Sequence, residues 1–144
     1  MMEKKRFRGY ISSRPFDGER APQHIQNLVI RTYCEDLGFE FLLSATEVAM
    51  PNSYLVLNRL ITEIEELDGV VFYSLRQLPE EPHHRRKIFH EVLAARREVH
   101  FSVERLAIQN NSDVNRVENI LGVAALLPQI PDIRTWYRAK THGK

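Results

Sequence analysis

Residues 7–15, FRGYISSRP, decide the fold that the rest of the chain completes. The apolar part of this stretch ends at Ile11 and runs directly into two serines and Arg14, before a proline stops it. A short apolar run that ends in hydroxyls and a guanidinium is typical of a buried strand whose carboxyl end emerges at a polar site. Ligands bind at that edge in open parallel sheets, so we expect a sheet built around this strand and a site beyond its end.

Apolar and amphipathic segments alternate along the remaining chain. Further strands are expected at 39–45, 70–75 and 98–103, with a short extension at 106–108. Helices are expected at 23–37, 54–66, 85–97 and from a cap at 112 or 113 to about 127, with a loop over 79–84. The alternation predicts an α/β fold, a three-layer sandwich in which a mostly parallel sheet of about four to five strands has helices on both faces.

Apolar residues at spacings of three and four predict which face of each helix is buried. In the first helix the predicted face includes Ile25, Leu28 and Tyr33. In the second helix it includes Leu55 and Leu57.

Several single features have both a structural and a functional interpretation. The basic run at 85–87 is expected to face solvent, with an anion or an acidic partner as the alternative. Cys34 is expected to be a buried, inert thiol rather than a nucleophile, and His100 a hydrogen-bonded core histidine. His83 and His84 lack a third ligand, so no metal site is expected there.

The composition is that of one soluble globular domain. Its 144 residues fall within the size of a single domain, which we place at 1–127, with 128–144 as a partly ordered tail. Hydrophobic residues make up 43%, and 20 basic against 19 acidic residues leave a net charge of +1, which argues against a nucleic-acid partner. The sequence has no apolar run that suits a membrane, and its single cysteine fits a reducing compartment, so we expect a cytoplasmic protein.

Polar side chains follow each expected strand at the point where it ends. Because parallel strands end at a common edge, we expect these groups to meet in one cleft. Guanidinium groups suit phosphate and carboxylate oxygens, so the cleft is predicted to bind a small anionic or sugar-linked ligand. The residues are Ser12, Ser13 and Arg14; Ser44, Thr46 and Glu47; Ser74, Arg76 and Gln77; and Ser102 and Glu104.

Charged groups are predicted to do the chemistry in this cleft. Arg14 and Arg76 hold the anion, and Glu47 or His24, at the start of the first helix, moves a proton. Glu104 is expected to contact the ligand as well. The alternative is structural: the arginines pair with the two glutamates, and the nearby hydroxyls cap helices.

Hydroxyl and amide groups are predicted to orient the ligand. They belong to Ser12, Ser13, Ser74 and Gln77. Consecutive strand residues face opposite sides, so at most one of the two adjacent serines reaches the cleft as a nucleophile. No cofactor or metal is expected, because the sequence contains neither a phosphate-loop glycine pattern nor a paired-histidine spacing.

The expected last helix carries a wide apolar surface around Ile120–Leu127. A surplus apolar face on a helix predicts either deep packing or a partner subunit. We therefore expect a homodimer or a higher homo-oligomer through this surface.

The order of elements over residues 8 to about 126 resembles the catalytic domain of serine recombinases of the resolvase/invertase family. GYISSRP (9–15) resembles that family's opening strand, and SLRQLP (74–79) resembles a later strand exit. The segment 99–127 resembles the fourth strand and the long helix that the family uses in dimerisation. The resemblance implies a resolvase-like fold.

The catalytic residues of that family are not matched. In an ungapped comparison the family's arginine falls on Ser12 and its nucleophilic serine on Arg14. Its aspartate–arginine pair falls on Arg76 and Gln77. The resemblance therefore implies the fold and not the cleavage of DNA.

Four phrases, GYISSRP, PQHIQN, LLSATE and VFYSLRQLP, resemble the sporadic carbohydrate cluster proteins, which are encoded with bacterial surface-polysaccharide genes. This resemblance covers nearly the whole chain and implies a biosynthetic context. It also implies that Gln26, within the second phrase, is a further ligand contact.

These features predict a small-molecule enzyme, or an enzyme-like binder, for an anionic or sugar-linked metabolite in bacterial surface-carbohydrate biosynthesis. One alternative is a non-catalytic dimeric scaffold or regulatory protein of a biosynthetic cluster. A second alternative is a degenerate protein of the recombinase fold that binds DNA.

Overall fold

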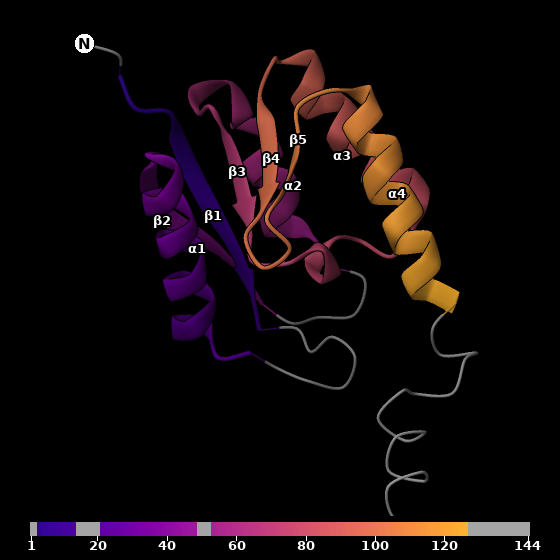
Figure 1. The fold of residues 1–144 in the computed structure, drawn as a ribbon, viewed down its shortest axis with the longest axis horizontal. Coiled ribbons are helices and arrows are strands. Elements are labelled where there is room, and N and C mark those ends of the chain that lie inside the picture. The colour runs from indigo at the N-terminus through magenta and orange to yellow at the C-terminus, as the bar shows by residue number, and fades with distance from the viewer. Residues whose placement is uncertain (1–2, 14–20, 49–52, 127–144) are drawn as a thin grey trace, which may run out of the picture.

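Five strands form one sheet in the order β2-β1-β3-β4-β5 (Figure 1). The structure, a computed structural model, describes residues 3–13, 21–48 and 53–126. β1 to β4 are parallel, and β5 runs antiparallel to β4, so the predicted mostly parallel sheet is confirmed and the predicted extension is its edge strand. The strands are β1 (Arg6–Ser12), β2 (Glu40–Glu47), β3 (Gly69–Phe72), β4 (Glu98–Phe101) and β5 (Leu106–Ile108).

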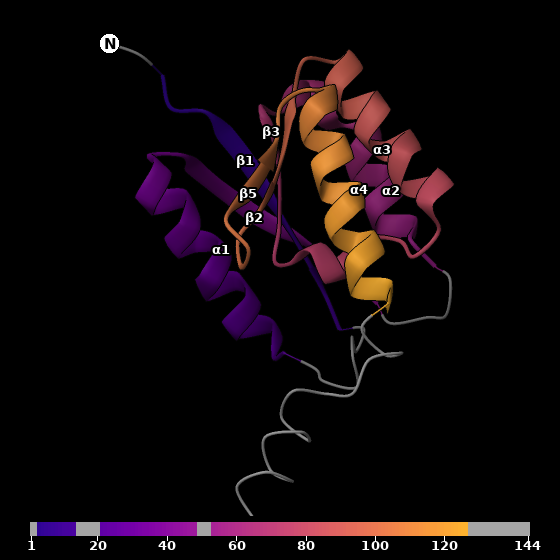
Figure 2. The ribbon, with the colours of Figure 1, turned by 45° about the vertical axis from the view of Figure 1, so that its right-hand side comes forward.

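Helices cover the two faces of the sheet unequally (Figures 1 and 2). α1 packs on one face, and α2, α3 and α4 pack on the other, which confirms the three-layer sandwich. The helices are α1 (Gln23–Leu37), α2 (Leu55–Thr62), α3 (Pro82–Ala94) and α4 (Asn111–Leu126), and two 3₁₀ turns are η1 (Ile64–Glu66) and η2 (Leu75–Gln77).

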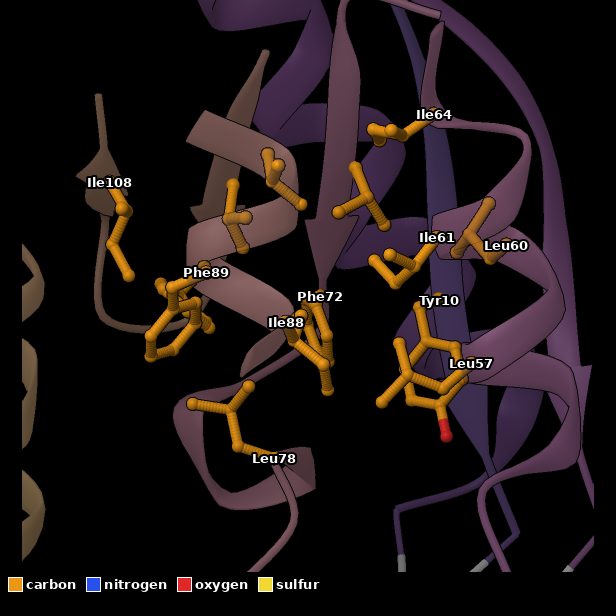
Figure 3. Close-up of a cluster of buried hydrophobic side chains, with 14 of the residues drawn as sticks. Tyr10, Leu57, Leu60, Ile61, Ile64, Phe72, Leu78, Ile88, Phe89 and Ile108 are labelled. Atoms are coloured by element: carbon orange, nitrogen blue, oxygen red, sulfur yellow. The ribbon is translucent and has the colours of Figure 1, made fainter. Parts of the chain in front are cut away.

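The larger hydrophobic core lies between the sheet and the three helices α2, α3 and α4 (Figure 3). Tyr10 of β1 and Phe72 of β3 contribute the central rings, and Leu57 and Phe89 enter from α2 and α3. β1 and β3 are also covered by α1 on the opposite face, which accounts for the continuous apolar sequence of β3. The smaller core under α1 contains Phe7, Ile11, Ile30, Tyr33, Cys34 and Val71.

Two glycines allow the central strands to approach their neighbours closely. A side chain on Gly69 would collide with the backbone carbonyl of Glu98 on β4. A side chain on Gly9 would collide with the hydroxyl of Ser44, which lies where the pairing of β2 with β1 shifts register. The spacing of the sheet at both positions therefore depends on the missing Cβ atom.

The buried faces of two helices differ from the predicted ones. Tyr33 is buried as predicted, but Ile25 and Leu28 are exposed and Gln26 is fully buried in their place. The pattern of apolar residues was misleading here because a glutamine is turned inward to bond the end of β1. Leu55 at the start of α2 is 74% exposed, so its predicted place in the core was wrong as well.

α3 begins at Pro82, inside the segment that was predicted to be a loop. Proline suits the first turn of a helix, where its missing N–H is not needed. Arg85 is buried against α4, so its predicted exposure was wrong, whereas Arg86 and Lys87 are exposed as expected.

The ends of several elements also differ from the predicted ones. β2 continues to Glu47, and β3 and β4 end at Phe72 and Phe101, earlier than predicted. The second helix ends at Thr62 and is followed by a 3₁₀ turn. Arg14, the predicted helix end at Leu127 and the predicted tail at 128–144 lie outside the described residues. In the described part of the chain, no helix has the length and apolar character needed to cross a membrane.

Candidate functional site

β1, β2, β3 and β4 end at one edge of the sheet, here called the carboxyl edge. Ser12 at the end of β1 pairs with Glu47 at the end of β2, and Tyr10 pairs with Phe72 of β3. Beyond β4, the N–H of Ser102 donates to the carbonyl of Phe72 at 3.0 Å. The expectation that these four strands end at a common edge is therefore confirmed, whereas Ser44 lies within β2 and donates to Asn27 of α1.

A pair of buried glutamine side chains joins three elements at this edge. Gln26 of α1 accepts from the N–H of Ser12 at 3.1 Å, and its Nε2 donates to the carbonyls of Ser12 and Ala21, both at 2.8 Å. Gln77 of η2 donates from Nε2 to Oε1 of Gln26 at 2.7 Å and accepts from the N–H of Tyr73 at 3.1 Å. The two amides thus hold the first turns of α1 against β1 and η2.

Glu47 is a buried carboxylate that caps a helix. Its Oε1 accepts from the hydroxyl of Tyr10 at 2.9 Å and from the N–H of Leu57 at 3.1 Å. Its Oε2 accepts from the N–H of Val56 at 3.0 Å. A negative charge at a helix start is stabilising, so this side chain links β1 and β2 to the beginning of α2.

Glu104 caps the start of η2 in the same way. Its Oε2 accepts from the hydroxyl of Ser74 at 2.7 Å, and its Oε1 accepts from the N–H of Leu75 at 3.0 Å. The Ser74 hydroxyl in turn accepts from the N–H of Arg76 at 3.2 Å. The sequence placed Ser74, Arg76 and Glu104 in one site, and the structure brings them together as a capped turn.

Several of the predicted site residues reach the surface at the carboxyl edge. Arg76 on η2, His24 in the first turn of α1 and Thr46 near the end of β2 are exposed, and Ser13 just beyond β1 and Glu104 beyond β4 are half-buried. Arg14 follows Ser13 and lies outside the described residues. The edge therefore offers a guanidinium, an imidazole and hydroxyls above a buried frame of glutamines and glutamates.

The start of α1 differs from the starts of α2 and η2. Pro22 precedes α1 and, as its N-cap residue, supplies no side-chain hydrogen bond to its first turn. The N-terminus of a helix carries a partial positive charge on its first N–H groups. Its fixed position beside η2 follows from the bond between Gln26 and Gln77.

A second polar cluster lies under α1 near the opposite ends of the strands. The Tyr33 hydroxyl lies 2.6 Å from Nδ1 of His100, and Nε2 of His100 lies 2.8 Å from Oε1 of Glu98. Lys5 donates to Oε2 of Glu98 at 2.9 Å. The predicted hydrogen-bonded core histidine is confirmed, but nothing in the sequence indicated which residues surround it.

Burial governs the ionisation of this cluster. It lowers the pKa of His100 although Glu98 favours the imidazolium, and it raises the pKa of Tyr33 to about 12. Burial also opposes ionisation of Glu98, but hydrogen bonds from His100, Lys5 and Gln109 outweigh it and lower the pKa of that carboxyl. Near neutral pH this cluster therefore consists of a neutral tyrosine, a neutral histidine, a carboxylate and an ammonium group.

The remaining predictions concern metals and the cysteine. Within residues 3–13, 21–48 and 53–126, no group of three or more histidine, cysteine, aspartate or glutamate side chains is placed to hold a metal ion. Cys34 is buried, as expected, and burial raises the pKa of its thiol to about 11. A thiol with so high a pKa is a poor nucleophile near neutrality.

Neither a protein-family model nor a curated protein sequence matches the chain. Among solved structures, the N-terminal catalytic domain of TP901-1 integrase aligns with a TM-score of 0.57 and 16% identity over 87% of this chain and 99% of that one. A resolvase family site-specific recombinase from Streptococcus pneumoniae aligns with a TM-score of 0.59 and 7% identity over 94% of this chain and 99% of that one.

These identities are low enough that the likeness speaks for the fold alone. It supports the predicted resemblance to recombinase catalytic domains, and it does not bear on the resemblance to carbohydrate cluster proteins. The positions onto which the recombinase residues fall are also used differently, since Ser12 is buried and bonded to Gln26, and Gln77 is buried in the glutamine pair. The chain has the α/β fold of a resolvase catalytic domain.

Proposed function

We propose that this protein is a small-molecule enzyme, or an enzyme-like binder, whose ligand is an anionic or sugar-linked metabolite held at the carboxyl edge of the sheet. The observation that carries the proposal is the bond between Gln26 and Gln77, which sets the start of α1 beside the turn that presents Arg76. The helix start and the guanidinium attract anions for independent reasons.

The buried frame supports this proposal because it fixes both elements before any ligand arrives. Gln26 anchors α1 to β1 through the backbone of Ser12, and Glu104 holds η2 through Ser74. A site that is already ordered loses less conformational entropy when a ligand binds. The frame residues are therefore proposed to position the ligand-contacting groups rather than to touch the ligand themselves.

The proposed contacts are the groups at the surface of the edge. Arg76 binds the anion, and Ser13 donates or accepts a hydrogen bond. Arg14 is proposed as a second anion contact. His24 is a better proton carrier than Glu47, since the Glu47 carboxylate already accepts three hydrogen bonds. The setting in bacterial surface-carbohydrate biosynthesis rests on the resemblance of the four sequence phrases.

A ligand screen tests the proposal. Thermal-shift measurements against nucleotide sugars, phosphorylated sugars and inorganic phosphate should show a stabilisation that saturates with concentration. Arg76→Ala should weaken the binding of the best compound by roughly tenfold or more, because a hydrogen bond to a charged group is worth about 1.5–3 kcal/mol. The melting temperature of the unliganded variant should stay near that of the parent, since the side chain is exposed.

Arg86→Ala is the matched control, because Arg86 is an exposed arginine on α3, outside the proposed site. Its affinity should equal that of the parent. The proposal fails if no compound gives a saturating shift, or if the Arg76 and Arg86 variants bind the best compound equally well. Binding to duplex DNA that weakens with salt would instead favour a recombinase-like role, in line with the fold.

The apolar face of α4 favours a second candidate, a dimeric scaffold. Ile120, Val123 and Leu126 recur at spacings of three and are 38%, 62% and 53% exposed. Val117 and Leu121 on the same helix pack on the core instead. A helix that is apolar on two sides is suited to a partner, and we propose a second copy of the chain.

Light scattering at micromolar concentration tests the second candidate. The parent protein should have the mass of a dimer, and Val123→Asp should convert it to a folded monomer. Leu121→Asp is unsuitable, because Leu121 contacts the core and its loss would confound folding with association. A monomeric parent would remove this candidate.

A further inference from the structure

α1 lies apart from the other helices of the sandwich (Figure 2). Among the described residues it is the only helix on its face of the sheet, where a small core of six buried hydrophobic residues holds it. Polar contacts add to that core. Near the beginning of the helix Gln26 bonds Ser12, and Asn27 accepts from the hydroxyl of Ser44. Near its end Tyr33 is bonded to His100 of β4, and Asp36 pairs with Arg105.

The bond between Tyr33 and His100 has a defined direction. Tyr33 remains protonated near neutrality, and Nε2 of His100 faces the carboxylate of Glu98 at 2.8 Å, so the imidazole proton resides on Nε2. Nδ1 is then the acceptor, and the Tyr33 hydroxyl is the donor at 2.6 Å. The rings of Phe7 and Phe39 meet the imidazole edge-on, with centroids 4.9 Å and 5.3 Å away, which excludes water from it.

A proton added to Nδ1 would change this contact. Nδ1 would become a donor, so the Tyr33 hydroxyl could no longer donate to it and would need another acceptor inside the core. The new positive charge would also lie in an apolar site, and among the described residues the carboxylate bonded to the imidazole is that of Glu98. That carboxylate already pairs with Lys5.

The other charged and titratable groups around the contact do not relieve this cost. Arg105 lies over the ring of Tyr33 with its guanidinium carbon 5.6 Å from the ring centroid and pairs with Asp36. Asp68 acts on Lys5, and Cys34 beside Tyr33 is a neutral thiol. The surroundings of the imidazole thus hold two cations and one directly bonded carboxylate.

We propose that the Tyr33–His100–Glu98 chain is a proton-sensitive clamp, defined by these three residues, which holds the C-terminal half of α1 on the sheet near neutrality and releases it in mild acid. The release would free one side of the helix that also carries Gln26 and His24. Mild acid would therefore loosen the carboxyl edge, a consequence that rests on the proposed function, whereas the release itself does not.

Cys34 provides a natural probe, because it is the only cysteine of the chain and is buried on the inner face of α1. Its rate of reaction with a dipyridyl disulfide, divided by the rate for the urea-unfolded protein at the same pH, reports opening of α1. This ratio should rise by up to about tenfold per pH unit as the pH falls below about 6.5, the usual histidine pKa. Amide protection factors, taken relative to the intrinsic exchange rate at each pH, should fall at Ile30 and Tyr33 of α1 and stay unchanged at Ile88 and Phe89 of α3.

Two variants should move the midpoint of His100 titration in the folded protein in opposite directions. Tyr33→Phe removes the donor that favours the neutral imidazole, so the midpoint should rise. Glu98→Gln removes the carboxylate that favours the imidazolium, so the midpoint should fall. His100→Gln should abolish the dependence, and His90→Gln, on the exposed face of α3, should leave it as in the parent.

The shift of the His100 imidazole signal in the NMR spectrum of each variant gives the second readout, and it applies even if His100→Gln does not fold. The clamp is refuted if the normalised Cys34 rate is flat between neutral and mildly acidic pH. It is also refuted if α1 and α3 lose protection together, or if Tyr33→Phe and Glu98→Gln leave the His100 midpoint where it is in the parent. Failure of the ligand screen would leave each of these outcomes unaffected, so the two proposals stand or fall separately.

Discussion

The hydroxyl of Tyr10 donates to Oε1 of Glu47 at 2.9 Å, and through this bond the inner face of the core is connected to the carboxyl edge of the sheet. Tyr10 is a fully buried core residue of β1, and its ring packs against Phe72 with centroids 5.0 Å apart. Glu47 ends β2 and caps α2 with the same carboxylate. A buried charge is tolerated here because three donors converge on it.

Loss of either partner should therefore destabilise the fold. Tyr10→Phe removes one hydrogen bond to a charged acceptor and should lower the free energy of unfolding by about 1.5–3 kcal/mol. Glu47→Ala should cost more, because it leaves the tyrosine hydroxyl and two backbone N–H groups without an acceptor. Urea denaturation followed by circular dichroism measures both.

The control for this pair is Glu40→Gln, since Glu40 is an exposed carboxylate on the same strand with a 3.9 Å contact to Arg6. An exposed ion pair contributes about 1 kcal/mol or less, so this variant should remain close to the parent. Equal losses for Glu40→Gln and Glu47→Ala would contradict a capping role for Glu47.

The fold could be predicted from the sequence because short apolar runs, which form the strands, alternate along the chain with amphipathic segments, which form the helices. β1 and β3 are apolar on both faces, and Asp68–Gly69 separates the second helical segment from β3 as a turn signal should. The errors arose where a polar side chain was turned inward. Gln26 and Arg85 are polar in sequence but buried in the structure, because each bonds backbone or charged groups of another element.

The candidate site was predictable only in its location. The rule that parallel strands end together placed Ser12, Glu47 and Ser74 at one edge correctly. The sequence did not show that Glu47 and Glu104 would cap α2 and η2, because capping depends on distances between segments that are far apart in the chain. The Tyr33–His100 contact was not predicted from the sequence for the same reason, since its partners are 67 residues apart in the chain.

Substitution of glycine should have opposite effects at two positions. Gly69→Ala forces a Cβ into the backbone carbonyl of Glu98, and a backbone atom cannot move away at low cost. The free energy of unfolding should therefore fall by several kcal/mol, or by about 1–3 kcal/mol if β4 can shift. Gly122 lies in α4, and no atom lies within 4 Å of the Cβ that Gly122→Ala would add. This variant should therefore raise the free energy of unfolding by about 0.5–1 kcal/mol. Thermal denaturation of both variants measures the difference, and a stable Gly69→Ala protein would contradict the close approach of β3 to β4.

The glutamine pair should show energetic coupling. Gln26→Ala and Gln77→Ala each remove the 2.7 Å bond between the amides. The loss in free energy of unfolding in the double variant should therefore be smaller than the sum of the losses in the two single variants. A coupling of about 0.5–1.5 kcal/mol is expected in a double-mutant cycle. The same cycle with Arg86→Ala in place of Gln77→Ala should be additive, and a coupling near zero for the glutamines would mean that the bond does not hold α1 against η2.

The ion pair of Arg85 and Glu118 should tolerate joint replacement better than loss of one partner. Arg85 donates to both carboxylate oxygens of Glu118, at 2.9 Å and 2.8 Å, and also to the carbonyls of Pro79 and Glu80. Glu118→Ala leaves a nearly buried guanidinium without its counterion and should cost about 3–5 kcal/mol. The double variant Arg85→Met with Glu118→Leu should be more stable than Glu118→Ala alone, as judged by urea denaturation, and the reverse order would refute this account.

The thiol of Cys34 should ionise only in strong alkali. Burial raises its pKa from the usual 9.0 to about 11, so the folded protein favours the neutral thiol. Because the folded pKa is the higher one, the stability that this group contributes is complete below pH 9 and is lost as the pH rises towards 11, by up to about 1.4 kcal/mol per unit. Thiolate absorbance in the far ultraviolet should have its midpoint near 11 in the folded protein and near 9 in urea, while Cys34→Ala should lack the signal and lose less stability over this range. A folded-state midpoint near 9 would mean that α1 does not keep this thiol from water, and it would also remove the basis for using Cys34 as a probe of the clamp.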